Sequence, residues 1–361
     1  MTMAEIIATL IKIVFFIFIF VFNTAALLTW VERKQSALMQ DRVGANRAAV
    51  FGIRAFGLFH IAADALKMFF KEDFRPQGAE RFLFSIAPAI TMFFATVAFA
   101  AIPFADTLIV GGREIAMQIA ALDVGILYVF AMMSMAVYGV VLGSWASNNN
   151  YSLIGGLRAS AQMISYEVAI GVAIIGVLMV FQSVDLQEIV RAQGQLLWGW
   201  LPKWGILVQP IGFLLFLTTG IAETKRIPFD APEGESEIIG YHVEFSSMRF
   251  GMYFLTDLIE TVLIASITVT LFLGGWQVPY LMPDGFHFPW GGTIMLSNVT
   301  VTILQFLSFS LKVAALLWFM MIIRWTLPRF RYDQVMFLGW KILLPVALAN
   351  IVVTAAIILL I

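Results

Sequence analysis

The chain is organised around an acidic stretch at residues 223–250, which reads ETKRIPFDAPEGESEIIGYHVEFSSMRF. Six of the chain's 23 acidic residues lie in it, although the molecule is 61% hydrophobic. They are Glu223, Asp230, Glu233, Glu235, Glu237 and Glu244. Apolar helical patterns lie on both sides of the stretch. We therefore expect an acidic loop at 223–245 between two membrane-type helices, and its carboxylates either form a solvated face or handle protons.

The composition of the whole chain indicates a polytopic helical membrane protein. Only 12% of the 361 residues are charged, against about 25% in soluble domains, and the mean hydropathy is +0.90. Long unbroken apolar runs exclude a β-barrel. The absence of cysteine excludes disulfides and cysteine-ligated iron–sulfur clusters in this chain, and the three histidines lie too far apart in sequence to suggest a metal site. The expected fold class is an all-α transmembrane bundle.

Apolar length, with charge and Pro/Gly breaks, predicts eight spans within a single transmembrane domain that covers residues 1–361. The polar segment 146–160 is expected to be a turn that starts the fourth span. The approximate limits of the spans are 6–30, 83–104, 123–145, 161–181, 204–222, 246–273, 299–324 and 338–360.

The basic residues predict which side of the membrane each connection faces. Of the 22 Lys and Arg residues, 17 lie in the connections 31–82, 146–160, 223–250 and 324–341. In an eight-span chain these connections share one side, which the positive-inside rule makes the cytoplasm or an organelle's matrix. The acidic loop is therefore expected on that side and both termini on the opposite side.

Residues 52–71 are too mixed in polarity to span, and their apolar residues recur at helical spacing. His60, Asp64, Lys67 and Lys71 follow one another at steps of 4, 3 and 4 residues. This pattern predicts an amphipathic helix at the membrane interface. Its polar stripe faces either water or a cavity beside the protein, and Asp64 is spaced to pair with Lys67.

Acidic residues inside the apolar spans are functional candidates, because an ionised carboxylate in hydrocarbon is costly. Glu167 lies about one turn inside the fourth span, and Asp257 and Glu260 lie three residues apart in the sixth. With Glu223 they would form a polar track from the acidic loop into the bilayer. Lys312 in the seventh span is the candidate countercharge.

Five long motifs resemble the H subunit family of proton-pumping NADH–quinone oxidoreductase, which is respiratory complex I. The resemblance covers nearly the whole chain in order, and motifs of this length are highly specific. They read WVERKQSALMQDRVG (30–44), AADALKMFFKE (62–72), WASNNNYSLIGGLRASAQMISYEVA (145–169), ETKRIPFDAPEGESEIIGYHVEFSSMRF (223–250) and PRFRYDQVMFLGWKILLP (328–345).

The resemblance implies a multi-pass subunit of the bacterial inner membrane, with periplasmic termini, that is not catalytic alone. Quinone is the implied substrate, while FMN and iron–sulfur clusters belong to partner subunits. The implied partners are the peripheral-arm quinone module, antiporter-like membrane subunits and lipid, with no nucleic acid. The implied quinone-chamber residues are Arg33, Asp64, Arg226, Phe229 and Asp230. The implied proton-coupling residues are Glu167, Glu223, Glu233, Glu235, Glu237 and Asp257.

The chain departs from the family pattern at a few positions. The family's usual G-P-N reads Gly44-Ala45-Asn46 here, and Asp257 stands where Glu is usual. Glu260 does not match a functional position of the family. The alternative functions are the homologous subunit of a membrane-bound hydrogenase or formate hydrogenlyase, a stand-alone ion transporter, for which no internal repeat is visible, and a purely structural anchor.

Overall fold

A computed structural model describes residues 3–110, 112–197, 199–234 and 237–360. The α-helices are α1 (Met3–Ile13), α2 (Phe22–Met39), α3 (Phe59–Phe70), α4 (Arg81–Val97), α5 (Gly125–Ala146), α6 (Asn150–Phe181), α7 (Leu186–Gln193), α8 (Gly205–Val208), α9 (Pro210–Glu223), α10 (Ser247–Phe272), α11 (Asn298–Thr326), α12 (Tyr332–Phe337) and α13 (Leu344–Leu360). Short π-helical segments, η1 (Val14–Val21) and η4 (Leu338–Leu343), join α1 to α2 and α12 to α13, and short 3₁₀ turns are η2 (Ala55–Gly57) and η3 (Ala98–Ala101).

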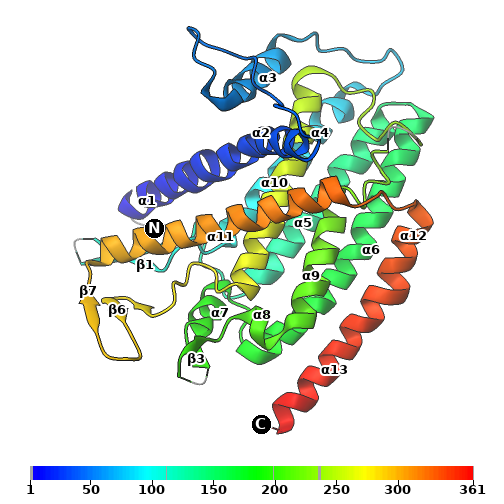
Figure 1. The fold of residues 1–361 in the computed structure, drawn as a ribbon. Coiled ribbons are helices and arrows are strands. Elements are labelled where there is room, and N and C mark those ends of the chain that lie inside the picture. Colours follow the sequence, from blue (N-terminus) through cyan, green and yellow to red (C-terminus); the bar gives the residue numbers. More distant parts are fainter. Residues whose placement is uncertain (1–2, 111, 198, 235–236, 361) are drawn as a thin grey trace.

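Three small antiparallel sheets complete the structure: β1–β2, β3–β4 and β5–β6–β7. In Figure 1 the long helices pack side by side, with α3 near one end of the bundle and the labelled strands β3, β6 and β7 toward the other. The strands are β1 (Thr107–Val110), β2 (Arg113–Ala116), β3 (Leu196–Leu197), β4 (Leu201–Pro202), β5 (Leu281–Met282), β6 (Gly285–His287) and β7 (Thr293–Met295).

Seven helices of the described chain are long and apolar enough to cross a membrane. The expected fifth span, 204–222, corresponds to α8 and the short apolar helix α9, which has 14 residues. This arrangement confirms the expected all-α bundle. The seven are Glu5–Met39, Arg81–Ala101, Gly125–Ala146, Asn150–Phe181, Ser247–Phe272, Asn298–Thr326 and Tyr332–Leu360.

The expected turn at 146–160 is wrong, because α6 already begins at Asn150. The Asn149 side chain caps the helix by accepting a hydrogen bond from the Tyr151 N–H at 2.9 Å. Gly156 does not mark a turn. A Cβ at this position would collide with the Ser144 hydroxyl, so glycine here allows α6 to approach α5 closely.

Two further helix boundaries differ from expectation. The first helical run continues through the charged residues to Met39, beyond the expected limit near residue 30. The interfacial helix α3 is shorter than the expected 52–71, because Phe56 has a positive φ of 53° that interrupts the helical path before it. The polar residues of the 30–44 motif therefore lie mainly on a helix that packs against α3 and α10.

The helix α10 forms the centre of the bundle. Its apolar window is 89% buried, whereas none of the other six spanning windows exceeds 50%. Its internal hydroxyls are satisfied locally: Thr261, Thr268 and Thr270 each donate to the carbonyl four residues earlier, at 2.6–2.7 Å. Among the described residues, the buried side-chain oxygens of α10 that lack any hydrogen-bond partner belong to Asp257 and Glu260.

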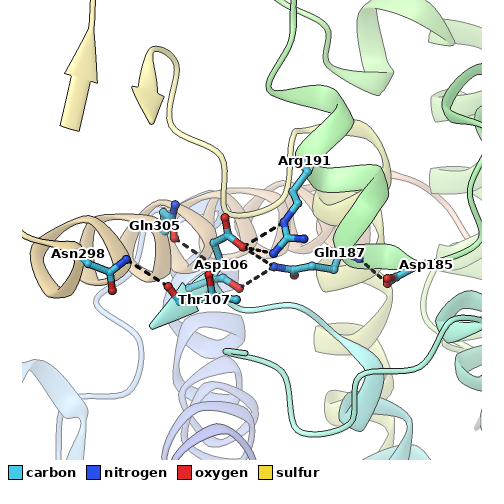
Figure 2. Close-up of polar contacts among 8 residues, drawn as sticks. Asp106, Thr107, Asp185, Gln187, Arg191, Asn298 and Gln305 are labelled. Atoms are coloured by element: carbon cyan, nitrogen blue, oxygen red, sulfur yellow. Dashed lines mark hydrogen bonds and ion pairs between the residues drawn. The ribbon is translucent and has the colours of Figure 1, made fainter. Parts of the chain in front are cut away.

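A polar cluster around Asp106 closes the end of the bundle that carries the small sheets (Figure 2). The Asp106 Oδ1 atom accepts hydrogen bonds from Gln187 Nε2 at 3.0 Å and from Arg191 Nη2 at 2.6 Å. The Asp106 backbone N–H donates to Gln305 Oε1 at 3.0 Å. This Asp106 cluster, comprising these four residues, ties α7 and α11 to the segment that leads into β1.

Candidate functional site

A cavity of about 520 Å³ lies between α2, α3 and α10. Its lining is mainly apolar and includes Met68 of α3 and Phe250 and Phe254 of α10. The charged pair Arg33 and Asp64 also lines it. A mostly apolar cavity with a few polar groups is typical of sites for small hydrophobic molecules.

Arg33 and Asp64 form an ion pair at the cavity wall, with 2.6 Å between Arg33 Nη2 and Asp64 Oδ2. The expected pairing of Asp64 with Lys67 is therefore wrong. The helix α2 continues past the expected end of the span, and this continuation places Arg33 beside α3. Asp64 of α3 therefore pairs with a cation from α2 and not with one from its own helix. The stripe residue Asp64 accordingly faces a cavity rather than open water.

The packing of α3 on α10 depends on a small residue and one hydrogen bond. A Cβ at Gly251 would lie 2.8 Å from the Met68 sulfur, so glycine lets the two helices approach. The Ser247 hydroxyl donates to the Met68 carbonyl at 2.9 Å and joins the end of α3 to the start of α10. These contacts set the width of the cavity.

A second feature, which we name the Lys225 cluster, consists of Lys225, Glu223, Glu233, Asp257 and Glu260. The Lys225 side chain is completely buried, with Nζ 2.8 Å from Asp257 Oδ1 and 3.6 Å from Glu260 Oε2. Among the described residues, neither oxygen of Glu223 or Glu260 has a hydrogen-bond partner, nor has Glu233 Oε1. Several carboxylates thus share one buried ammonium.

The end of α9 explains how Lys225 reaches this position. The helix ends at Glu223, and Lys225 has a φ of 54°, in the left-handed region that terminates helices. Glycine usually occupies such a position, and another residue there costs roughly 1 kcal/mol. The left-handed turn carries the Lys225 side chain back toward α10, where it meets Asp257.

Glu167 and Glu223 continue the cluster toward α5 and α6. Glu223 is only 2% exposed. Glu167 is half-buried on α6 and accepts a hydrogen bond from the Ser134 hydroxyl of α5. The charges of Glu167 and Glu260 both act on Glu223. The structure therefore brings Glu167, Glu223 and the two acids of α10 within electrostatic range, as the sequence indicated.

The loop that follows α9 folds into the protein. Gln162 of α6 donates to the carbonyls of Ala222 and Phe229 at 2.8 and 2.9 Å. Phe229 is buried against the rings of Tyr166 and Phe330. A fully solvated acidic loop is therefore wrong for this part of the stretch, although Phe229 does not line the cavity.

Side chains from other elements pair with two further charges of the loop, those of Arg226 and Asp230. Arg226 and Arg324 share Glu32, at 3.3 and 2.9 Å. Asp230 pairs with Arg329 at 2.8 Å. Arg226 and Asp230 thus lie among ion pairs with α2, α11 and the segment after α11, outside the cavity lining.

The two remaining acids predicted for proton coupling, Glu235 and Glu237, are not part of the Lys225 cluster as described. Glu237 is exposed and pairs with Arg158 at 2.8 Å, so this end of the stretch fits the solvated alternative. Glu235 lies outside the described residues. The role of both in proton coupling stays a prediction.

Burial changes the proton affinity of the loop's ionisable groups. It raises the pKa of Glu233 well above its ordinary value, and the charge of Asp257 adds to this. Burial also raises the pKa of Asp230, against the opposing charge of Arg329. For Lys225, burial alone would lower the pKa, but the charges of Asp257 and Glu260 outweigh it and hold the pKa well above its ordinary value. The ammonium therefore remains protonated.

Lys312 is not the countercharge of the acids, and this expectation is wrong. Its Nζ donates to the carbonyls of Gly275 at 3.0 Å and Gln277 at 2.7 Å, beyond the end of α10. Asp257 lies fifteen residues before that end, which is about 22 Å along a helix. The actual countercharge, Lys225, comes from the turn after α9.

Reasoning from the sequence did not assign Lys225 or Glu32 to this charged region. One feature of the sequence could have assigned Lys225 to this region: it lies two residues after an acid at the end of an apolar span. For Glu32 the only such feature is its position at the end of the first apolar run. Glu260 was expected in the polar track, and the structure places it in the Lys225 cluster. Within the described ranges, no group of three or more His, Asp or Glu side chains converges as metal ligands.

Comparisons with known proteins agree on one family. The family model described as NADH dehydrogenase matches residues 11–355. The chain is 44% identical to H subunit 1 of the NADH-quinone oxidoreductase of Cytophaga hutchinsonii, over 92% of this chain and 91% of that protein. It is 44% identical to H subunit 1 of the same enzyme of Geobacter metallireducens, over 95% and 94%. It is 41% identical to H subunit 2 of the enzyme of Rhizobium meliloti, over 91% of each chain.

Proposed function

The chain belongs to the H subunit family of NADH-quinone oxidoreductase, and we propose that it binds quinone beside α3 and couples quinone reduction to proton translocation. The chain is a multi-pass membrane protein, a subunit of an oxidoreductase complex that is not catalytic alone. The names of its relatives favour this family over the hydrogenase, formate hydrogenlyase and stand-alone transporter alternatives.

One observation carries the coupling proposal: α10 contributes to both the cavity and the Lys225 cluster. Phe254 and Leu255 line the cavity, and Asp257 and Glu260 follow on the same helix. The step from Phe254 to Asp257 is about 4.5 Å along a helix axis. A charge or shape change at the cavity therefore acts on the acids through one rigid element.

The cavity residues suit the head of a quinone. Reduction to quinol takes two electrons and two protons, and we propose that the electrons come from an iron–sulfur cluster of the peripheral arm. Arg33 can donate hydrogen bonds to a quinone oxygen, and Asp64 holds the guanidinium in place. The apolar walls from α3 and α10 accept the ring and the start of the tail.

The proposed path of the proton signal runs from the cavity to Asp257 and Glu260, then to Glu223 and Glu167. Each of these acids is buried or half-buried and near another acid. Such neighbours titrate as a group, so protonation of one changes the affinity of the next. Antiporter-like subunits beside α5 and α6 would receive the signal.

The proposed orientation places the acidic loop on the cytoplasmic side of a bacterial inner membrane and both termini in the periplasm. Most Lys and Arg residues lie in the connections at the loop's side. The peripheral-arm quinone module would cover the cavity and the loop from that side. The cavity would then recognise the ring and the apolar tail that quinones have in common.

Photoaffinity labelling of the purified complex tests the proposed quinone site. A quinone with a photoreactive ring substituent is expected to label peptides from α2, α3 or the first two turns of α10, and unmodified quinone should compete. Arg33→Gln is expected to raise the KM for quinone, while electron transfer from NADH to a water-soluble acceptor stays normal. Labelling confined to other helices, with an unchanged KM, would contradict the proposal.

A further inference from the structure

The Lys225 cluster holds more buried carboxyl groups than cations. Asp257 and Glu260 contact the ammonium of Lys225, and the charges of Glu223 and Glu233 lie within its electrostatic range. Ionising all four would leave several uncompensated negative charges in a buried volume, which is strongly unfavourable. Some of these carboxyls must therefore carry protons.

The neighbouring arginines offset this imbalance only in part. Arg226 and Arg324 share the single acid Glu32, which leaves one positive charge against four carboxyl groups, and Arg329 is engaged by Asp230. Lys225 is thus the cation in direct ionic contact with the acids of α10 among the described residues. The other flank of its ammonium is the ring of Tyr241, whose centre lies 5.5 Å from Nζ.

The position of the ammonium is intermediate between two acids. Its Nζ lies 2.8 Å from Asp257 and 3.6 Å from Glu260, which are one turn apart on α10. Within the described part of the chain, neither Nζ nor Asp257 Oδ1 makes a hydrogen bond of normal geometry, despite the short ion-pair distance. A lysine side chain with four rotatable bonds can close on either carboxylate without backbone movement.

We propose that Lys225 is a positioning residue for proton transfer: its ammonium is shared between Asp257 and Glu260 and moves toward whichever of them is ionised. This inference rests on the proposed function, because it names the residue that controls the proposed proton path. The surrounding charged and titratable groups are Glu223 from α9, Glu233 and Tyr241 from the loop, and Glu167 from α6.

The step is balanced in charge and protons. In one state Asp257 is ionised beside the ammonium and Glu260 carries a proton. The proton passes from Glu260 to Asp257, directly or through water, and the ammonium follows the negative charge to Glu260. Lys225 keeps all its protons, and the net charge of the three side chains is zero in both states. Glu223 can then pass a proton to Glu260 and become ionised itself, and Asp257 can release its proton to water, which returns the pair to its first state.

The test uses the assembled complex in sealed membrane vesicles, with quinone reduction and proton uptake both measured. Lys225→Met is expected to lower proton uptake about tenfold or more, because it removes the shared charge from a buried acidic group. Lys225→Arg should retain much of the activity. Lys341→Met, an exposed lysine, is the matched control and should behave as wild type.

A charge-compensated double variant separates this role from simple packing. In Lys225→Met/Glu260→Gln the lost cation is balanced by a lost acid, so activity and assembly should exceed those of Lys225→Met. If the single variant fails to assemble, recovery of assembly in the double variant supports the proposal. A double variant no better than the single one, or wild-type proton uptake in Lys225→Met, overturns it.

The same experiment distinguishes failure of this inference from failure of the proposed function. Glu167→Gln tests proton coupling without touching Lys225. If Glu167→Gln lowers proton uptake while Lys225→Met does not, coupling stands and only the role of Lys225 is lost. If both variants pump as wild type, proton coupling through this chain is lost as well.

Discussion

The two polar clusters of this bundle differ in how their hydrogen bonds are satisfied. One oxygen of Asp106 receives donors from Gln187 and Arg191, and the Asp106 N–H is accepted by Gln305 (Figure 2). In the Lys225 cluster, both oxygens of Glu223 and of Glu260 lack hydrogen bonds to any described residue. The acid of the first cluster has two donors, although Gln187 Oε1 beside it lacks a partner among the described residues, whereas the acids of the second cluster share one flexible cation.

This difference gives a criterion for distinguishing structural from functional polar groups in a membrane bundle. A satisfied network holds its members in one arrangement and stabilises the fold. A buried carboxyl without donors is destabilised when ionised and therefore takes up a proton readily. Polar residues that connect helices and acids that exchange protons can thus be told apart by their partners, although both are buried.

The largest expected effect comes from Asp257→Asn, which removes the closest partner of the buried ammonium. Breaking a buried pair by removing one member costs about 3 kcal/mol or more, and Glu260 compensates part of this. We expect a thermal midpoint several degrees lower and about tenfold less proton uptake, since the shared site loses one acid. The matched control is Asp73→Asn, which removes the acid of a more exposed pair with Arg249. Normal proton uptake in Asp257→Asn would show that the cluster is only structural.

A smaller effect is expected from Asp106→Asn, which weakens the Asp106 cluster. The amide keeps an acceptor for Gln187 but loses the charge that holds Arg191, whose side chain is half-exposed. The expected loss of stability is about 1 kcal/mol, measured as a lower thermal midpoint of the complex. The number of protons moved per quinone reduced should not change. A fall in that ratio would show that the Asp106 cluster also takes part in proton translocation.

The smallest effect is the pH dependence contributed by Glu233. Its pKa is raised by burial, so the folded state favours the protonated acid. This stabilisation is complete below the ordinary pKa of about 4.3 and is lost as the pH rises through the higher folded value. The glutamine in Glu233→Gln stays neutral at every pH. The thermal midpoint of this variant, relative to that of wild type, should therefore rise as the pH increases. A difference that is constant with pH would contradict the raised pKa of Glu233.

Local patterns in the sequence sufficed for much of the fold and part of the site. Continuous apolar length indicated the all-α bundle, and acids inside apolar runs pointed to Glu167, Asp257 and the acidic stretch around Glu223. These features are readable because burial of apolar surface and the penalty on charge in hydrocarbon act on each segment separately. The long motifs likewise identified the family, since each is contiguous in sequence.

Only the tertiary structure decided which charges meet. Asp64 pairs with Arg33 and not with Lys67, and Lys225 replaces Lys312 as the countercharge of Asp257. Helical spacing predicts neighbours on one helix, but a buried charge selects its partner from whichever helices pack around it. Those partners depend on helix ends, such as the left-handed turn at Lys225, and on glycines that set how closely two helices approach. The acidic stretch was readable from its sequence, whereas the role of Lys225 as the countercharge of Asp257 follows only from the packing of α9 and α10.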